Sequence, residues 1–201
     1  ESVRHAITKL SHYHFVTNDD SYRRVLRMGE DPDTVFAVGS LDVEYAGLIR
    51  TPLDSVRLNS HGVGDWIDIE KPFLTVINHP VTSDDSNRSN MLALFKAVAS
   101  LGYPTVWFWP NSDAGTDQVA EAIRHFREQE PRAKKSFRFV INLPSEEFIA
   151  LLRRTSCLVG NSSAGIKECS YLGIPVVNLG SRQAGRLRAE NVRDAPYQEF
   201  D

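Results

Sequence analysis

Short, continuous apolar runs alternate with helical patterns along most of this chain, and this alternation limits the folds that it can adopt. Strands that are apolar at every position are typical of a parallel sheet buried on both faces. The pattern therefore predicts an α/β fold with a Rossmann-like, doubly wound parallel sheet. The apolar runs cover residues 35–38, 73–78, 105–109, 137–141, 157–160 and 176–179, and the helical patterns cover 87–100, 115–129, a stretch from 145 onward, and 164–172.

The first 38 residues form a separate group of predicted elements: a helix, a strand over 13–17, a helix over 20–29 and the strand over 35–38. We interpret residues 1–38 as the last α/β unit of a truncated N-terminal Rossmann-like domain. Residues 39–201 are then the second domain, with a hinge at Gly39 and Ser40. The first helical pattern is already under way at Glu1, so we expect a piece of a longer protein. Between residues 53 and 68 only a partial helix is predicted.

Composition argues against several classes of partner. The 201 residues carry a net charge of −3, which argues against a nucleic-acid partner. No apolar run approaches the roughly 20 residues that a membrane span requires, so we expect no membrane partner. Cys157 and Cys169 form no Cys-x-x-Cys pattern. We therefore expect two buried free thiols of a cytoplasmic protein, no metal site and no cofactor.

Polar residues follow the predicted strands, at the sheet edge where doubly wound folds bind their ligands. His79 follows the strand over 73–78 and is either held by its own loop or contacts phosphate or transfers a proton. Asn111 and Asp113 follow the next strand; both are possible helix caps, and Asn111 is the better ligand candidate. Leu143 marks a position where main-chain groups could bind a nucleobase.

The turn Gly160–Gly165 combines small residues with the start of a predicted helix. Such a turn presents free N–H groups and the positive end of the helix dipole to an anion. Ser162 and Ser163 add hydroxyl donors, so the turn is a candidate diphosphate site, although serine there is also an ordinary cap. Glu168 is either an exposed helix residue or a ligand of ribose hydroxyls. Arg182 follows the last predicted strand, where its guanidinium could neutralise phosphate.

These motifs resemble those of a known family, and they occur here in the family's order. The family is the hydrolysing UDP-N-acetylglucosamine 2-epimerases of sialic- and nonulosonic-acid biosynthesis, and the matching segments are residues 4–12, 77–82, 110–115, 160–168 and 173–183. The resemblance implies the C-terminal nucleotide-binding part, which is one half of a two-domain GT-B architecture. It implies a catalytic role for His79, and it implies UDP contacts at His79, Asn111, Leu143, Ser162, Ser163, Glu168 and Arg182.

The reaction implied by the resemblance converts UDP-N-acetylglucosamine and water to N-acetylmannosamine and UDP, through elimination of UDP and hydration of the product. The expected partner is thus a small nucleotide sugar, UDP or UDP-N-acetylglucosamine, and the full-length enzyme is expected to be a homodimer. The family's acid/base carboxylates lie mainly in the N-terminal domain, so we expect this chain alone to be inactive. The alternative function is a GT-B glycosyltransferase with a UDP-sugar donor. The sugar itself stays open between N-acetylglucosamine and a 4-acetamido-6-deoxy derivative.

Overall fold

A computed structural model describes residues 2–81, 86–110, 116–129 and 136–197. The chain divides into two compact units, Glu1–Tyr45 and Ala46–Asp201, and α3 (Leu41–Leu48) spans the division. The expected domain boundary after residue 38 stays a prediction, because compactness alone does not say to which domain a segment belongs.

The first unit contains a small parallel sheet and two helices, at the positions that the sequence predicts. Its two strands, β1 (His14–Val16) and β2 (Val35–Ala37), pair in parallel. The helices are α1 (Ser2–Leu10) and α2 (Asp19–Arg27), and a 3-10 turn η1 (Pro32–Thr34) precedes β2. The rings of Phe15 and Phe36 stack on one face of this sheet, with centroids 5.6 Å apart.

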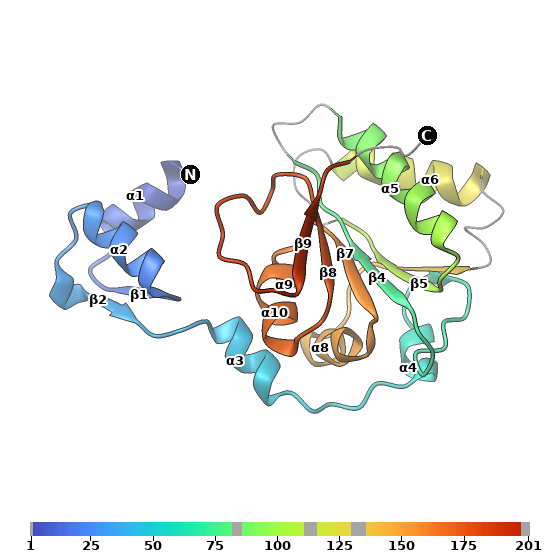
Figure 1. The fold of residues 1–201 in the computed structure, drawn as a ribbon, viewed down its shortest axis with the longest axis horizontal. Coiled ribbons are helices and arrows are strands. Elements are labelled where there is room, and N and C mark those ends of the chain that lie inside the picture. The colour runs from blue at the N-terminus through green and yellow to red at the C-terminus, as the bar shows by residue number, and fades with distance from the viewer. Residues whose placement is uncertain (1, 82–85, 111–115, 130–135, 198–201) are drawn as a thin grey trace. The chain divides into compact units, whose positions relative to one another are not determined.

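The second unit is built on a seven-stranded sheet in the order β3-β6-β5-β4-β7-β8-β9 (Figure 1). All neighbouring strands are parallel except β3, which is antiparallel to β6. Numbered along the chain, the six parallel strands have the order 3-2-1-4-5-6, which is the doubly wound arrangement. The strands are β3 (Val63–Gly64), β4 (Leu74–Ile77), β5 (Thr105–Phe108), β6 (Phe137–Val140), β7 (Cys157–Gly160), β8 (Val176–Leu179) and β9 (Val192–Ala195).

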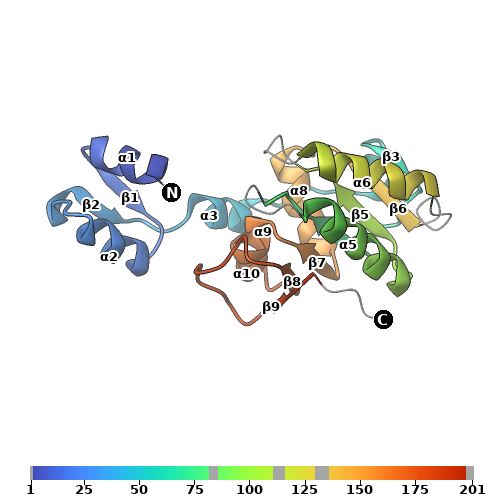
Figure 2. The same ribbon diagram turned by 90° about the horizontal axis from the view of Figure 1, so that it is seen from above.

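Helices cover both faces of this sheet (Figures 1 and 2), so every residue of its strands β4, β5 and β6 is buried. One face packs on α5 (Asn87–Leu101) and α6 (Thr116–Gln129). At the centre of this layer, the ring centroid of Phe95 lies 3.9 Å from that of Trp107 and 4.1 Å from that of Phe126. The other face packs on α4 (Ser55–Asn59), α8 (Ser145–Arg154), α9 (Ser163–Ile166) and α10 (Glu168–Leu172). The predicted fold class is confirmed.

The helix predicted over 164–172 is wrong in one respect, because it is interrupted at Lys167. This residue has φ −102° and ψ −79°, which separates α9 from α10. The main-chain N–H of Lys167 donates to the oxygen of Ser163 at 3.0 Å, so the first turn is still closed. The spacing of the apolar residues gives no sign of this interruption. The interruption changes main-chain angles, but it leaves the same residues facing the core.

Arg138 organises the segment 53–68, for which the sequence predicts little. It lies in β6, is buried, and donates to the main-chain oxygens of Asn59, His61, Gly64 and Asp65. Burial lowers the pKa of its guanidinium. These bonds tie the end of α4 and the short strand β3 to the edge of the sheet.

Candidate functional site

The site forms where β4 and β7 lie side by side. From there the chain continues from β4 to β5 on one side and from β7 to β8 on the other. This is the topological switch point, where doubly wound sheets bind ligands. Gly160, the last residue of β7, has φ +135°. A β-carbon there would stand 2.0 Å from the main-chain oxygen of Ile77 in β4. Only glycine therefore lets the two strand ends approach so closely.

Asn161 joins the ends of these two strands, although we predicted no role for its side chain. Its Oδ1 accepts from the main-chain N–H of His79 at 2.7 Å, and its Nδ2 donates to the main-chain oxygen of His79 at 2.8 Å. Both residues are buried. The main chain of His79 is thus held by the turn that follows another strand. Its imidazole is the part for which we predicted a functional role.

The serine turn directly follows Asn161. Ser162 caps α9, since its Oγ accepts from the N–H of Ala164 at 3.3 Å. In the described part of the chain, the main-chain N–H groups of Ser162 and Ser163 have no acceptor. Two free N–H donors and two hydroxyls at the switch point suit an anionic ligand. Because α9 is only one turn long, these local donors matter more than the dipole of a long helix.

Arg182 reaches the same turn from the end of β8. Its Nη1 donates to the main-chain oxygen of Asn161 at 3.1 Å, and Nε2 of Gln183 donates to the same oxygen at 2.8 Å. The guanidinium of the exposed Arg182 has further N–H groups that a ligand could use. The structure thus brings His79, the serine turn and Arg182 together. Gln183, which is buried, is a residue that sequence reasoning missed.

The remaining predicted residues lie farther along the edge or outside the described residues. The side chain of Leu143 is buried in the core on the α8 side, so only its main chain is available to a ligand. Glu168 is half-buried and is the first residue of α10. Asn111 lies outside the described residues.

Behind the loop of Leu143, the first turn of α8 is anchored by a buried carboxylate. Oε1 of Glu147 accepts a hydrogen bond from Nε of Arg57 at 2.8 Å, and Nη2 of Arg57 lies 2.7 Å from the same oxygen in an ion pair. Nε2 of His61 lies 3.0 Å from the other oxygen, Oε2. This second contact does not meet the geometry of a hydrogen bond. Together these contacts fix the start of α8 against the end of α4.

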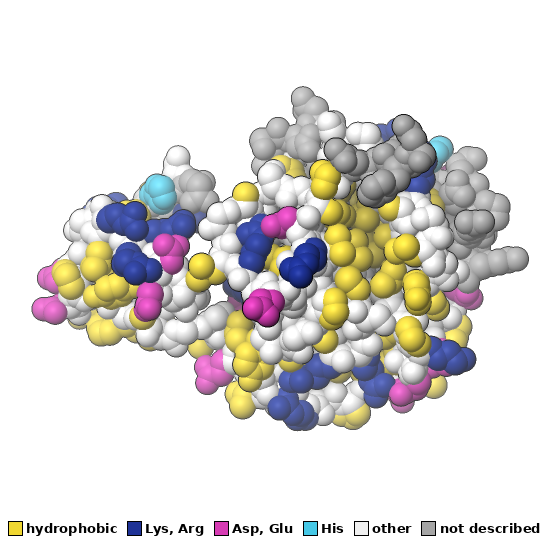
Figure 3. Space-filling view, viewed as in Figure 1, with side chains coloured by type: hydrophobic (Ala, Val, Ile, Leu, Met, Phe, Trp, Pro, Cys, Tyr) yellow, Lys and Arg dark blue, Asp and Glu magenta, His cyan; other side chains and the backbone are white. Residues whose placement is uncertain are grey.

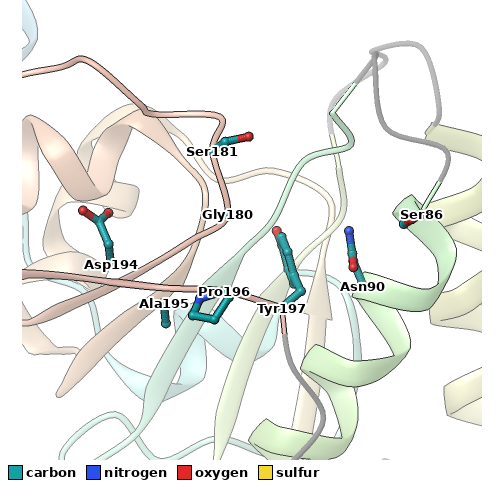
Figure 4. Close-up of a pocket in the computed structure, with 8 residues that line it drawn as sticks. All are labelled: Ser86, Asn90, Gly180, Ser181, Asp194, Ala195, Pro196 and Tyr197. Carbon is teal, nitrogen blue, oxygen red and sulfur yellow. The ribbon is translucent and has the colours of Figure 1, made fainter.

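A pocket of about 570 Å³ lies beside the site, at the ends of β8 and β9 and the start of α5 (Figure 4). Its wall includes Tyr197. The hydroxyl of Tyr197 donates a hydrogen bond to Oδ1 of Asn78 at 2.6 Å and accepts one from Nδ2 of Asn161 at 3.4 Å. None of the predicted site residues that the structure describes lines it. It is lined by Ser86, Asn90, Gly180, Ser181, Asp194, Ala195, Pro196 and Tyr197.

Three further observations bear on possible ligands and partners. Among the described residues, no group of three His, Cys, Asp or Glu side chains is arranged to hold a metal ion. No described helix combines the length and the apolar character needed to cross a bilayer. On the face shown in Figure 3, Lys and Arg side chains are interspersed with Asp and Glu.

Comparison with known proteins gives the family. A family model described as UDP-N-acetylglucosamine 2-epimerase matches residues 1–199. The chain belongs to the UDP-N-acetylglucosamine 2-epimerase family. This match gives no support to the glycosyltransferase alternative.

Two relatives in the epimerase family show how much of a full protein the chain represents. The UDP-N,N'-diacetylbacillosamine 2-epimerase (hydrolyzing) of Legionella pneumophila is 35% identical over 195 residues, which are 96% of this chain and 49% of that protein. The UDP-N-acetylglucosamine 2-epimerase of Neisseria meningitidis is 30% identical over 200 residues, which are 98% of this chain and 50% of that protein. The chain thus spans about half the length of these relatives.

Solved epimerase structures share the fold. A Methanocaldococcus jannaschii UDP-GlcNAc 2-epimerase in complex with UDP-GlcNAc and UDP has a TM-score of 0.63 at 14% identity, over 95% of this chain and 52% of that one. An S. aureus MnaA–UDP co-structure has a TM-score of 0.64 at 14% identity, over 87% of this chain and 44% of that one. The predicted GT-B-type fold is confirmed.

Proposed function

We propose that this chain is the UDP-binding portion of a hydrolysing UDP-N-acetylglucosamine 2-epimerase, which converts UDP-N-acetylglucosamine and water to N-acetylmannosamine and UDP. The observation that carries the proposal is the serine turn at the switch point. There the free N–H groups of Ser162 and Ser163 lie next to a carbonyl held by Arg182. The family match and the hydrolysing relatives support the same reaction.

In this reaction the sugar loses UDP from C1 and a proton from C2, and water then adds across the resulting double bond. The diphosphate leaves with the former anomeric oxygen, so negative charge develops on the leaving group. Donors that are already in place stabilise such charge without reorganising. The N–H groups and hydroxyls of Ser162 and Ser163, together with the guanidinium of Arg182, supply these donors. His79 contacts the same group from β4 and assists its departure.

The rest of the nucleotide would extend along the edge of the sheet from the serine turn. We propose that the main chain at Leu143 binds the uracil, that the carboxylate of Glu168 accepts from the ribose hydroxyls, and that Asn111 contacts the nucleotide. The anchoring of Glu147 supports this placement, since it fixes the helix behind the Leu143 loop.

Residues 1–38 are proposed to be the last α/β unit of the N-terminal domain, and that domain supplies the acid/base carboxylates. The two-stranded sheet of residues 1–38 leaves Phe15 70% and Phe36 42% exposed, as expected where more of a domain packs on it. We accordingly propose that the chain alone does not turn over substrate. The full-length enzyme is proposed to act in the cytoplasm as a homodimer. Its sugar is N-acetylglucosamine or a 4-acetamido-6-deoxy derivative, since relatives are named for both classes.

Calorimetric titration of UDP into this chain tests the proposed site. Ser162→Ala and Ser163→Ala are each expected to weaken binding by about 1–3 kcal/mol. Ser100→Ala is the matched control, because this exposed serine lies at the other end of α5 and bonds only the oxygen of Ala97. If both serine variants bound UDP as tightly as the Ser100→Ala control, Ser162 and Ser163 would not belong to the site.

The reaction itself is tested with full-length protein and UDP-N-acetylglucosamine, without an acceptor. Release of UDP together with N-acetylmannosamine supports the epimerase. No turnover of this sugar or of the 4-acetamido-6-deoxy derivative would contradict it.

A further inference from the structure

Two asparagines hold the loop after β4 in the same way. Asn161 bonds the main-chain N–H and oxygen of His79, at 2.7 and 2.8 Å. Asn87, at the start of α5, bonds the main-chain N–H and oxygen of Val81, at 2.8 and 3.0 Å. A primary amide suits this task, because it offers an acceptor and donors on one planar group. Each asparagine replaces the two bonds that a neighbouring strand would make.

The main chain of Asn161 also makes hydrogen bonds, and these link it to two other parts of the candidate site. Its N–H donates to the oxygen of Ile77 at 3.1 Å, and its oxygen accepts from Arg182 and Gln183. The next residue is Ser162, the first of the proposed nucleotide site. Asn161 is fully buried, with 0% of its surface exposed. A single residue therefore connects the His79 loop, the serine turn and the turn that carries Arg182.

We propose that Asn161 is a positioning residue for the nucleotide, and that its side chain sets the place of His79 relative to the serine turn. This inference rests on the proposed function. Without the amide, the N–H and oxygen of the buried His79 lose these two bonds, and buried polar groups that lose bonds shift to restore them. A displacement of about 1 Å at a site costs up to about a hundredfold in rate. Asn161 touches no substrate in this scheme and acts through His79 and the serine turn.

Two alanine variants of the 201-residue chain test the inference. Asn161→Ala removes the side-chain bonds to the main-chain N–H and oxygen of His79, and Asn87→Ala removes those to the main-chain N–H and oxygen of Val81, two residues farther along the same loop. Hydrogen exchange at the amides of His79 and Val81 is expected to accelerate only in the variant that loses the bond to that amide. Thermal unfolding is expected to show similar losses of stability. UDP affinity by calorimetry is expected to fall about tenfold or more in Asn161→Ala, and less than about threefold in Asn87→Ala.

Similar losses of UDP affinity in the two variants would overturn the inference, since a merely structural bond has the same effect at either asparagine. The wild-type titration decides the proposed function separately. If wild type does not bind UDP, the proposed function fails, and a positioning role for the nucleotide fails with it. Exchange at His79 then still reports whether Asn161 holds the loop.

Gln183→Met provides a second test if Asn161→Ala does not fold. It removes the bond from Nε2 to the oxygen of Asn161 at similar side-chain volume. Oε1 of Gln183 is buried and has no hydrogen-bond partner among the described residues, so methionine also removes an unfavourable polar atom. We expect unchanged stability and UDP binding that is weaker by about threefold or more. Unchanged binding in a folded Gln183→Met variant would contradict a role for this turn's geometry.

Discussion

The main-chain oxygen of Ile77 occupies the space that a β-carbon on Gly160 would need, at a separation of 2.0 Å. The oxygen is a main-chain atom and the main chain fixes the position of the β-carbon, so no side-chain rotation can relieve the contact. The positive φ of Gly160, +135°, adds a conformation that other residues rarely adopt. The junction between β4 and β7 therefore depends on this glycine.

Gly160→Ala is expected to destabilise the chain by more than about 4 kcal/mol, because the strands must separate at the centre of the sheet. Urea unfolding, followed by circular dichroism, measures the loss. Gly102→Ala is the matched control: its φ is +71°, and an added β-carbon meets nothing within 4 Å. That variant is expected to lose only about 1–2 kcal/mol. Equal losses would show that φ alone, and not the contact with Ile77, makes glycine necessary.

Glu147→Gln is expected to lower the free energy of unfolding by about 1–3 kcal/mol, since Arg57 and His61 lose their shared carboxylate. Denaturation at low and high salt measures the change. The control is Glu70→Gln, because Glu70 pairs with Arg154 at 2.6 Å but its side chain is 64% exposed. We expect less than about 1 kcal/mol there. A loss at Glu147 no larger than at Glu70 would count against an anchor behind the Leu143 loop.

Cys169 is expected to make stability fall as the solution becomes alkaline. Burial, and then the charge of neighbouring Glu168, raise the pKa of its thiol to about 12 from an ordinary value of 9.0. The unfolded thiol ionises first, so its contribution is complete below pH 9 and is lost between pH 9 and 12. The slope is at most about 1.4 kcal/mol per pH unit.

Burial also raises the pKa of Cys157, so the pH experiment is performed in a Cys157→Ser background. Unfolding free energies at pH 8, 9 and 10 are compared with and without Cys169→Ala. The difference between the two series should shrink as pH rises. A constant difference would mean that Cys169 ionises as readily in the folded chain as in the unfolded one.

In the second unit, the central strands with two buried faces could be predicted from sequence, and the edge strands β3 and β9 could not. All four residues of β4 are buried, as are all four of β5, which produces a run without charged residues. The edge strand β9 exposes Arg193 and Asp194, so its sequence resembles a loop. β3 has only two residues and is specified by its partner Arg138. Such a distant bond leaves no periodic pattern.

The part of the candidate site that follows from strand order alone could be predicted from sequence. The carboxyl ends of parallel strands meet at one edge, so His79, the serine turn and Arg182 were expected there together. The role of Asn161 could not be predicted, because an asparagine before a helix is ordinarily a turn residue and its partner His79 is 82 positions away. Gln183 was missed for the same reason, since its partner is a main-chain oxygen.

The two-residue strand β3 and the bonds of Arg138 also affect how easily another chain can add a strand to this sheet. An uncovered edge of a sheet is a template on which a foreign strand can add, and this is a common start of aggregation. Here β3 runs against β6 in the opposite direction, and the guanidinium of Arg138 occupies the oxygens of Gly64 and Asp65. The segment that sequence describes least well thus protects the protein from strand addition at this edge of the sheet.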